Sequence, residues 1–110
     1  MTMISFEDFK KLDIKIGEVK SAERVPDTDK LIRLMVDFGV EEDRQIISGI
    51  AKYTEPEALI GRRFPFIINI EPRVIHGLES NGMILAIFSN ESEFSFLEPT
   101  SDIPNGSSIQ

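Results

Sequence analysis

The sequence contains no cysteine and only one histidine, and these absences remove several classes of function. Without cysteine the chain has no disulfide, no thiolate metal site and no cysteine nucleophile, which fits a reducing compartment. Carboxylates are then almost the only metal ligands, and Asp27 and Asp29 lack the remaining positions of a calcium-binding loop. We therefore expect neither a metal nor a cofactor.

Long apolar runs are also missing. No segment approaches the length of a membrane span. Residues 1–7 lack the basic cluster followed by an apolar run that marks a secretory signal, so we expect a soluble cytoplasmic protein without membrane partners. The 110 residues predict one domain, 1–110, and a composition of 41% hydrophobic and 28% charged residues lies in the globular range.

Basic residues are absent from the last third of the chain. All 12 Lys and Arg residues lie at or before Arg73, whereas residues 74–110 contain acidic residues but no Lys or Arg. The net charge of −7 is unusual for a nucleic-acid-binding protein, because such proteins commonly show a basic footprint. Since the acidity is concentrated toward one end, a local basic face built from the first two thirds is compatible with this distribution.

Two short helices are predicted from the signals at their ends. Near residues 6–11, Ser5 and Asp8 form a capping-box-like pair, and Ile4 and Phe9 occupy the positions of a hydrophobic staple. The second helix is expected between residues 54 and 61. Its signals are a capping box of Thr54 with Glu57, Pro56 in the first turn, and Gly61 as the C′ glycine.

Alternation of apolar and polar residues predicts five strands. The first begins at Leu12, and the change of phase at Val19 indicates a bulge at Gly17. The others cover 32–38, 45–50, 64–70 and 83–88. Five strands with a helix between the third and fourth form the layout of the oligonucleotide-binding fold (OB-fold), an all-β barrel. Residues 94–97 and Ile109 predict further strand pieces, packed outside the barrel as a C-terminal extension.

Several ordered blocks of the sequence resemble one family. They include L-D-I-K-I-G-E-V (12–19), S-G-I-A-K-Y (48–53), P-E-A-L-I-G (56–61) and N-I-E-P-R-V-I-H-G-L-E-S-N-G-M-I-L (69–85). This pattern resembles the tRNA-binding domains found in stand-alone bacterial and archaeal proteins, in the C-terminal part of methionyl-tRNA synthetases and in CsaA-type secretion chaperones. The resemblance implies an OB-fold, a homodimer in the stand-alone members, and recognition of tRNA by its shape.

The resemblance also implies a tRNA-binding surface. Basic side chains there would neutralise phosphates, and an exposed Met would offer a surface for a base or ribose. Glu71 and Val74 depart from the family pattern and reduce the positive charge, so we expect weak or salt-sensitive binding. The implied contacts are Lys30 and Arg33 on the second strand, Lys52 after the third, Asn69 on the fourth, Arg73, and the turn with Ser80, Gly82 and Met83.

Apolar residues near both ends of the chain form a further candidate surface. They either cover the base of the barrel or form the apolar patch of a dimer interface. The candidate dimer residues are Ile4, Phe6, Phe9, Phe94 and Phe96.

Catalysis is not expected. His76, Glu79 and Ser80 lie within one loop and lack visible oxyanion donors, so no catalytic residue is assigned. The predicted function is a non-catalytic, structure-specific tRNA-binding protein that acts as a homodimer or as an accessory to an aminoacyl-tRNA synthetase. The alternative, favoured by the acidic balance, is a CsaA-like peptide-binding secretion chaperone.

Overall fold

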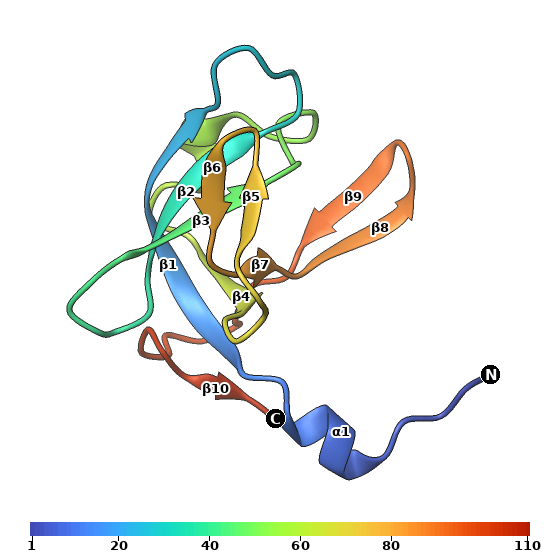
Figure 1. Cartoon of the computed structure of the whole chain (residues 1–110). Coiled ribbons are helices and arrows are strands. Elements are labelled where there is room, and N and C mark those ends of the chain that lie inside the picture. Colours follow the sequence, from blue (N-terminus) through green and yellow to red (C-terminus); the bar gives the residue numbers. More distant parts are fainter.

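The computed structural model describes residues 1–110 and consists mainly of antiparallel strands (Figure 1). Five of them form a nearly closed barrel in the order β3-β2-β1-β4-β7. This arrangement confirms the all-β OB-fold predicted from the sequence. The barrel strands are β1 (Ile14–Arg24), β2 (Ile32–Asp37), β3 (Arg44–Ser48), β4 (Arg63–Ile67) and β7 (Met83–Ile84).

The barrel interior is filled by the apolar residues that alternate along its strands. Ile32, Leu34 and Val36 of β2 are completely buried, as are Phe64 and Phe66 of β4. Because side chains of a strand point alternately to opposite faces, Arg33 and Met35 between the core residues of β2 lie on its outer face and are only partly buried, whereas Pro65 of β4 is buried on its outer face as well. The alternation in the sequence therefore predicted these two core faces correctly.

Strand β1 begins at Ile14, two residues later than predicted, and its bulge does not lie at Gly17. Gly17 pairs regularly with Phe64, and the register shifts between Val19 and Ser21. A Cβ atom at Gly17 would lie 2.5 Å from Cγ1 of Val36, so glycine is required here by close packing rather than by a bulge.

The two faces of β1 contact different parts of the chain, which explains the change of phase. Val19 faces the barrel core. Ile14 and Ile16 are buried on the other face, where β10 (Ser108–Ile109) pairs with β1 and Ile109 lies opposite Ile14. The predicted C-terminal extension is thus a real element: β10 pairs along the edge of β1, and Leu97 and Ile103 line a small cavity together with Ile16.

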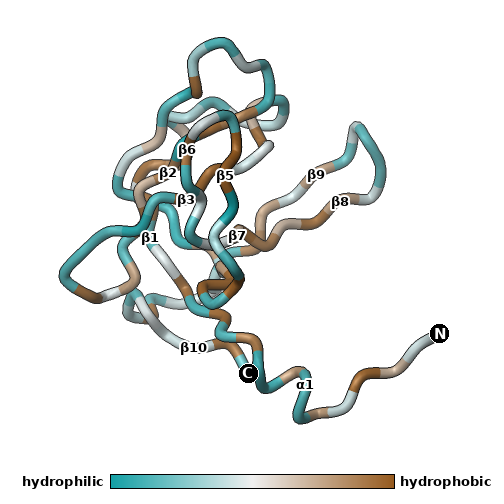
Figure 2. Tube along the Cα trace, in the orientation of Figure 1, coloured by the Kyte–Doolittle hydropathy of each residue, from teal (hydrophilic) through white to brown (hydrophobic).

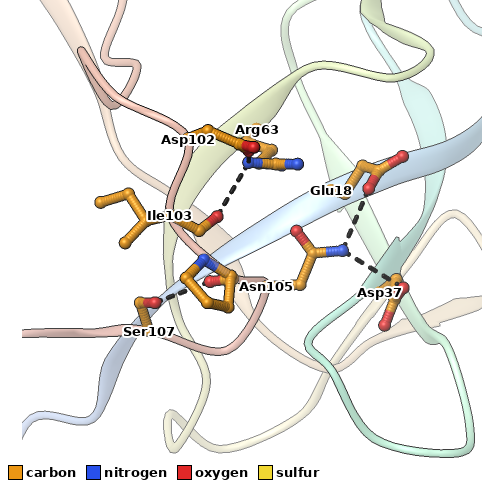
Figure 3. Close-up of polar contacts among 8 residues, drawn as sticks. Glu18, Asp37, Arg63, Asp102, Ile103, Asn105 and Ser107 are labelled. Carbon is orange, nitrogen blue, oxygen red and sulfur yellow. Dashed lines mark hydrogen bonds and ion pairs between the residues drawn. The ribbon is translucent and has the colours of Figure 1, made fainter.

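Figure 3 shows how this extension is fastened to the barrel. The Asn105 amide donates to Oε1 of Glu18 at 3.0 Å and to Oδ2 of Asp37 at 3.3 Å. The hydrogen bond from Asn105 is the main reason that the pKa of Glu18 lies below its ordinary value. Nearby, Arg63 donates to Asp102 at 2.7 Å and to the carbonyl of Ile103 at 2.8 Å.

Both predicted helices exist, although only one has the predicted cap. In α1 (Phe6–Lys10), Oγ of Ser5 accepts from the Asp8 amide at 3.1 Å, as the capping box predicted. The second is a single 3₁₀ turn, η1 (Pro56–Leu59), with Glu55 at its N-cap and no side-chain cap. The Thr54 hydroxyl instead donates to the carbonyl of Glu55, so the predicted Thr54 cap is wrong. Neither helix is both long and apolar enough to span a membrane.

The predicted fifth strand, 83–88, is divided. Only β7 pairs with β4, and β8 (Ala86–Asn90) leaves the barrel to pair with β9 (Glu93–Phe96) in a projecting hairpin (Figure 1). Aromatic packing explains the departure, because Phe94 stacks on Tyr53 at 4.6 Å and Phe96 stacks on Phe64 at 4.7 Å between ring centroids. The fourth strand also ends earlier than predicted, at Ile67.

A second hairpin, β5 (Arg73–Ile75) with β6 (Leu78–Ser80), was not predicted. Its two-residue turn consists of His76 and Gly77, with φ values of 51° and 79°. Positive φ at both positions is the geometry that a tight hairpin favours. This hairpin packs beside β3 and completes the wall between β3 and β7.

Candidate functional site

A groove of about 320 Å³ opens where β3, the β5–β6 hairpin and the start of β8 meet. Eight of its eleven lining residues are hydrophobic, its only charged residue is Arg73, and no acidic side chain lines it. An apolar groove with one cation suits a ligand that combines an apolar face with a negative charge. Its apolar lining includes Ile47, Ile50, Ile75, Met83, Ile84 and Phe88.

Lys30 and Lys52 stand beside one end of this groove. The carbonyl of Lys30 accepts from the Ala51 amide at 3.0 Å, which brings the loop before β2 against the loop after β3. Leu31, next to Lys30, and Ile50, two residues before Lys52, line the groove, and both lysines are exposed. Lys30 precedes β2 rather than lying on it, which corrects its predicted position.

Lys30, Lys52 and Arg73 do not form ion pairs with carboxylates of the chain. Among the basic side chains without a carboxylate partner, Arg44 is bound to the carbonyls of Ile68 and Asn81. Of the remaining four, Arg73 lines the groove, and Lys30 and Lys52 lie in the two loops beside it. The seven that do pair with carboxylates are Lys10, Lys11, Lys20, Arg24, Arg33, Arg62 and Arg63.

Ser80 and Gly82 fix the backbone next to the groove. Ser80 is 4% exposed, and its hydroxyl accepts from the Ile47 amide at 2.9 Å and donates to the Gly82 carbonyl at 3.1 Å. A Cβ at Gly82 would lie 3.0 Å from the carbonyl oxygen of Ile67. Met83, by contrast, is 40% exposed at the groove.

Arg33 and Asn69 are engaged elsewhere in the chain. Arg33 is half-buried and donates to Glu23 at 2.8 Å and to Gln45 at 2.7 Å. Asn69 follows β4 instead of lying on it. Its amide oxygen accepts from the backbone of Asp13 at 2.8 Å and its amide nitrogen donates to the carbonyl of Lys11 at 2.6 Å, which ties it to the junction of α1 and β1.

Of the eleven residues that line the groove, only Arg73 and Met83 were among the predicted contacts, and Ile75 and Phe88 are two that were missed. Phe88 is 56% exposed, yet its ring packs edge-to-face on Tyr53 and Phe94 with centroids 5.6 and 5.0 Å apart. The alternation at residues 83–88 predicted that Phe88 belongs to a barrel strand, so it was not identified as a possible contact. The sequence His76-Gly77 was the available signal for the hairpin that carries Ile75.

The predicted dimer residues fall into two groups. Ile4, Phe6 and Phe9 lie on the N-terminal arm and are 68%, 71% and 37% exposed. Figure 2 shows apolar stretches in this arm, which projects from the barrel. Phe94 and Phe96 are half-buried in the chain's own aromatic cluster, so less of their surface is available. Phe6, Phe9, Leu12 and Ile109 also line a cavity of about 260 Å³.

Two other features contrast with the groove. A larger hollow of about 630 Å³ is lined by Glu42 and Asp43, and its acidic side chains disfavour a phosphate ligand. Away from the groove, Arg62 donates to Glu98 at 2.8 Å. This hydrogen bond raises the pKa of Arg62 and lowers the pKa of Glu98, so the pair is a structural ion pair that holds the extension.

Comparisons with known proteins agree with this architecture. Over 107 residues the chain is 44% identical to the methionine–tRNA ligase of Flavobacterium johnsoniae, covering 97% of this chain and 15% of that protein. The crystal structure of a MetRS-related protein from Pyrococcus horikoshii has a TM-score of 0.94 and 35% identity, with full coverage of both chains. Chaperone CsaA from Bacillus anthracis has a TM-score of 0.88 and 35% identity, covering 99% of this chain and 100% of that one.

The relatives differ greatly in length. The chain spans 15% of the F. johnsoniae ligase and 16% of the ligase of Porphyromonas gingivalis, so it corresponds to one small part of each. The family model described as a putative tRNA-binding domain matches residues 14–108, which is almost the whole chain. The chain therefore belongs to this family of tRNA-binding domains, related to a segment of methionine–tRNA ligases.

Proposed function

We propose that the chain binds tRNA without catalysing a reaction, through the groove and the basic residues around it. Lys30, Lys52 and Arg73 supply the phosphate contacts, and Met83 supplies an apolar contact. Ser80 and Gly82 support these contacts from beneath by fixing the chain between β6 and β7. Cytoplasmic tRNA is the expected partner.

The supporting observation is the distribution of unpaired charge. Seven basic residues are paired with carboxylates. Of the remaining five, Arg73 lines the groove, Lys30 and Lys52 lie in the loops beside it, and no acidic side chain lines it. The net charge of −7 therefore does not describe the surface that a phosphate would meet. Asp27 and Asp29 lie in the same loop as Lys30 and weaken the local field, so binding should be salt-sensitive.

Filter binding with a salt titration tests this proposal. tRNA should bind more tightly than duplex DNA at low salt, and the affinity should fall as salt rises because counterions are released. Equal affinity for tRNA and duplex DNA, or no tRNA binding at about 50 mM salt, would contradict the proposal.

A matched pair of charge variants locates the surface. Arg73→Ala should weaken tRNA binding by about tenfold and reduce the slope of the salt dependence by about 1. Lys20→Ala removes the same charge from β1, where the ammonium already lies 3.5 Å from Glu18, and should leave the affinity nearly unchanged. Equal losses in the two variants would mean that overall charge, and not the groove, determines affinity.

We further propose that two copies associate through the N-terminal arm. The exposed Ile4, Phe6 and Phe9 are the residues that such an interface would bury. Two barrels would then offer tRNA a wider surface. An accessory role beside an aminoacyl-tRNA synthetase is a second form of the same function, in which the domain raises the local concentration of tRNA.

Peptide holding is the alternative function, favoured by the 35% identity and TM-score of 0.88 to chaperone CsaA and by the apolar cavity beside α1. A variant lacking Lys30 and Arg33 separates the two activities. Suppression of aggregation of a denatured client by this variant would support the chaperone function, and lack of effect on any client by the unmodified protein would eliminate it.

A further inference from the structure

The groove contains an exposed aromatic ring that is held in a fixed position. Phe88 is more than half exposed, although exposure of such a ring to water is unfavourable. Its edge contacts with Tyr53 and Phe94 restrict its orientation. The hydroxyl of Tyr53 in turn donates to the carbonyl of Glu91 at 3.2 Å, which ties the β8–β9 hairpin to the loop after β3. The ring is therefore a preformed flat surface.

The residues around Phe88 define the chemistry of its partner. Met83 and Ile75 extend the apolar surface, and Arg73 is the one charged group in the groove. A ligand that fits must place a flat apolar face on the groove and a negative charge near Arg73. A nucleotide displaced from an RNA helix has this combination, because its base is flat and its phosphate is anionic.

The size and charge of the groove favour one nucleotide over a peptide segment. Its volume of about 320 Å³ is at the lower end of the range for ligand pockets. No acidic side chain lines it, and Lys30 and Lys52 stand at its end as free cations. A basic or neutral peptide would gain nothing from these charges, whereas the anionic backbone of an RNA strand would be attracted by Arg73 and by the two lysines.

We propose that the groove binds one unstacked nucleotide of the RNA, with its base on Phe88 and Met83 and its phosphate at Arg73. This inference rests on the proposed tRNA binding and adds to recognition by shape a requirement for an unpaired, displaced nucleotide. Phe88 is then a specificity residue, since duplex RNA keeps its bases stacked and cannot offer a free face.

The test uses two hairpin oligoribonucleotides that differ only by one bulged adenosine. The unmodified protein should bind the bulged hairpin about tenfold more tightly than the fully paired one. Phe88→Leu keeps an apolar side chain of similar size but removes the aromatic face, and Phe88→Ala removes the side chain. Both variants should lose this preference and bind the two hairpins with similar affinity.

A spectroscopic probe is available because the chain contains no tryptophan. In Phe88→Trp the indole replaces the ring at the groove, and stacking of a base should quench its fluorescence when the bulged hairpin binds. Ile87→Trp is the matched control, since its side chain lies on the opposite face of β8 and is also exposed. Its emission should not change.

The outcomes separate this inference from the proposed function. If the protein binds tRNA but binds the two hairpins equally, or if Phe88→Trp is not quenched by the bulged hairpin, the nucleotide site is overturned and tRNA binding stands. If the protein does not bind tRNA at all, both proposals are overturned. A bulge preference that persists in Phe88→Leu also overturns the role of the aromatic ring.

Discussion

Single residues in this domain separate into those that meet solvent at the groove and those that support it. Ser80 belongs to the second group because it is buried and its hydrogen bonds are all made to the backbone of Ile47 and Gly82. The sequence could point to Ser80 only as part of a family motif. Its partner Ile47 lies 33 residues away, and sequence spacing carries no information about that contact.

Ser80→Ala should therefore reduce stability more than RNA affinity. The Ile47 amide would lose its acceptor in a buried position, at a cost of about 1–3 kcal/mol in the free energy of unfolding. Urea denaturation measures this loss, and the tRNA affinity of the folded fraction should stay within about twofold. A variant of normal stability with strongly weakened tRNA binding would show that the hydroxyl contacts RNA directly.

The hydrogen bond from Asn105 to Glu18 makes the stability of the protein depend on pH. Because its amide lowers the pKa of Glu18 below the ordinary value of 4.5, the stabilisation is fully present above that value. It is lost as the pH falls through the lowered pKa of the folded state. Asn105→Ala should thus unfold more easily at neutral pH, by about 1–3 kcal/mol, and show a shallower loss of stability in acid.

Thermal denaturation between neutral and acidic pH measures this effect. Glu18→Gln is the control, because it removes the titrating group while keeping an acceptor for the Asn105 amide. An acid dependence that is the same in Asn105→Ala and the unmodified protein would show that other carboxylates control acid unfolding.

Secondary-structure elements were predictable where their signals were local. Alternation along residues 32–38 identified β2, and Ser5 identified the start of α1, since each signal lies within the element itself. The division of the fifth strand could not be predicted, because Phe88 of β8 packs on Tyr53 and Phe96 of β9 packs on Phe64, and both partners are distant in sequence. The β5–β6 hairpin could have been predicted from His76-Gly77.

Asn69 holds the connection between α1 and β1 in place. Its side chain bridges the carbonyl of Lys11 and the amide of Asp13, so it fixes the direction of the N-terminal arm. Asn69→Ala should weaken association of two copies, by about tenfold in the dimer dissociation constant, while each copy stays folded. Sedimentation measures the association. Weaker tRNA binding at a protein concentration where the dimer is intact would instead support a direct contact by Asn69.

At the scale of the whole molecule, the acidic and basic residues are divided between surfaces. Composition predicted a conflict between the net charge of −7 and nucleic-acid binding. The structure reduces that conflict, since the ion pairs that neutralise seven basic residues lie outside the groove. Which basic residues stay unpaired depends on three-dimensional neighbours and could not be counted from the sequence.

Association of two copies is the property of the whole molecule most open to measurement. Phe6→Asp places a charge in the exposed apolar arm and should convert the protein to a monomer in light scattering. Val40→Asp is a suitable control, because Val40 is 67% exposed in the loop after β2, away from the arm. A dimer that survives Phe6→Asp would require a different interface.

The pairing of β10 with β1 also bears on the order in which the protein folds. Asn105 and Glu18 are 87 residues apart in the chain, so their contact closes one of the longest loops in the molecule. Because closing so long a loop is costly in entropy, we expect residues 103–109 to dock after the barrel strands have paired. Substitutions in this segment should therefore accelerate unfolding and leave the folding rate nearly unchanged, so the segment governs how long the native barrel persists.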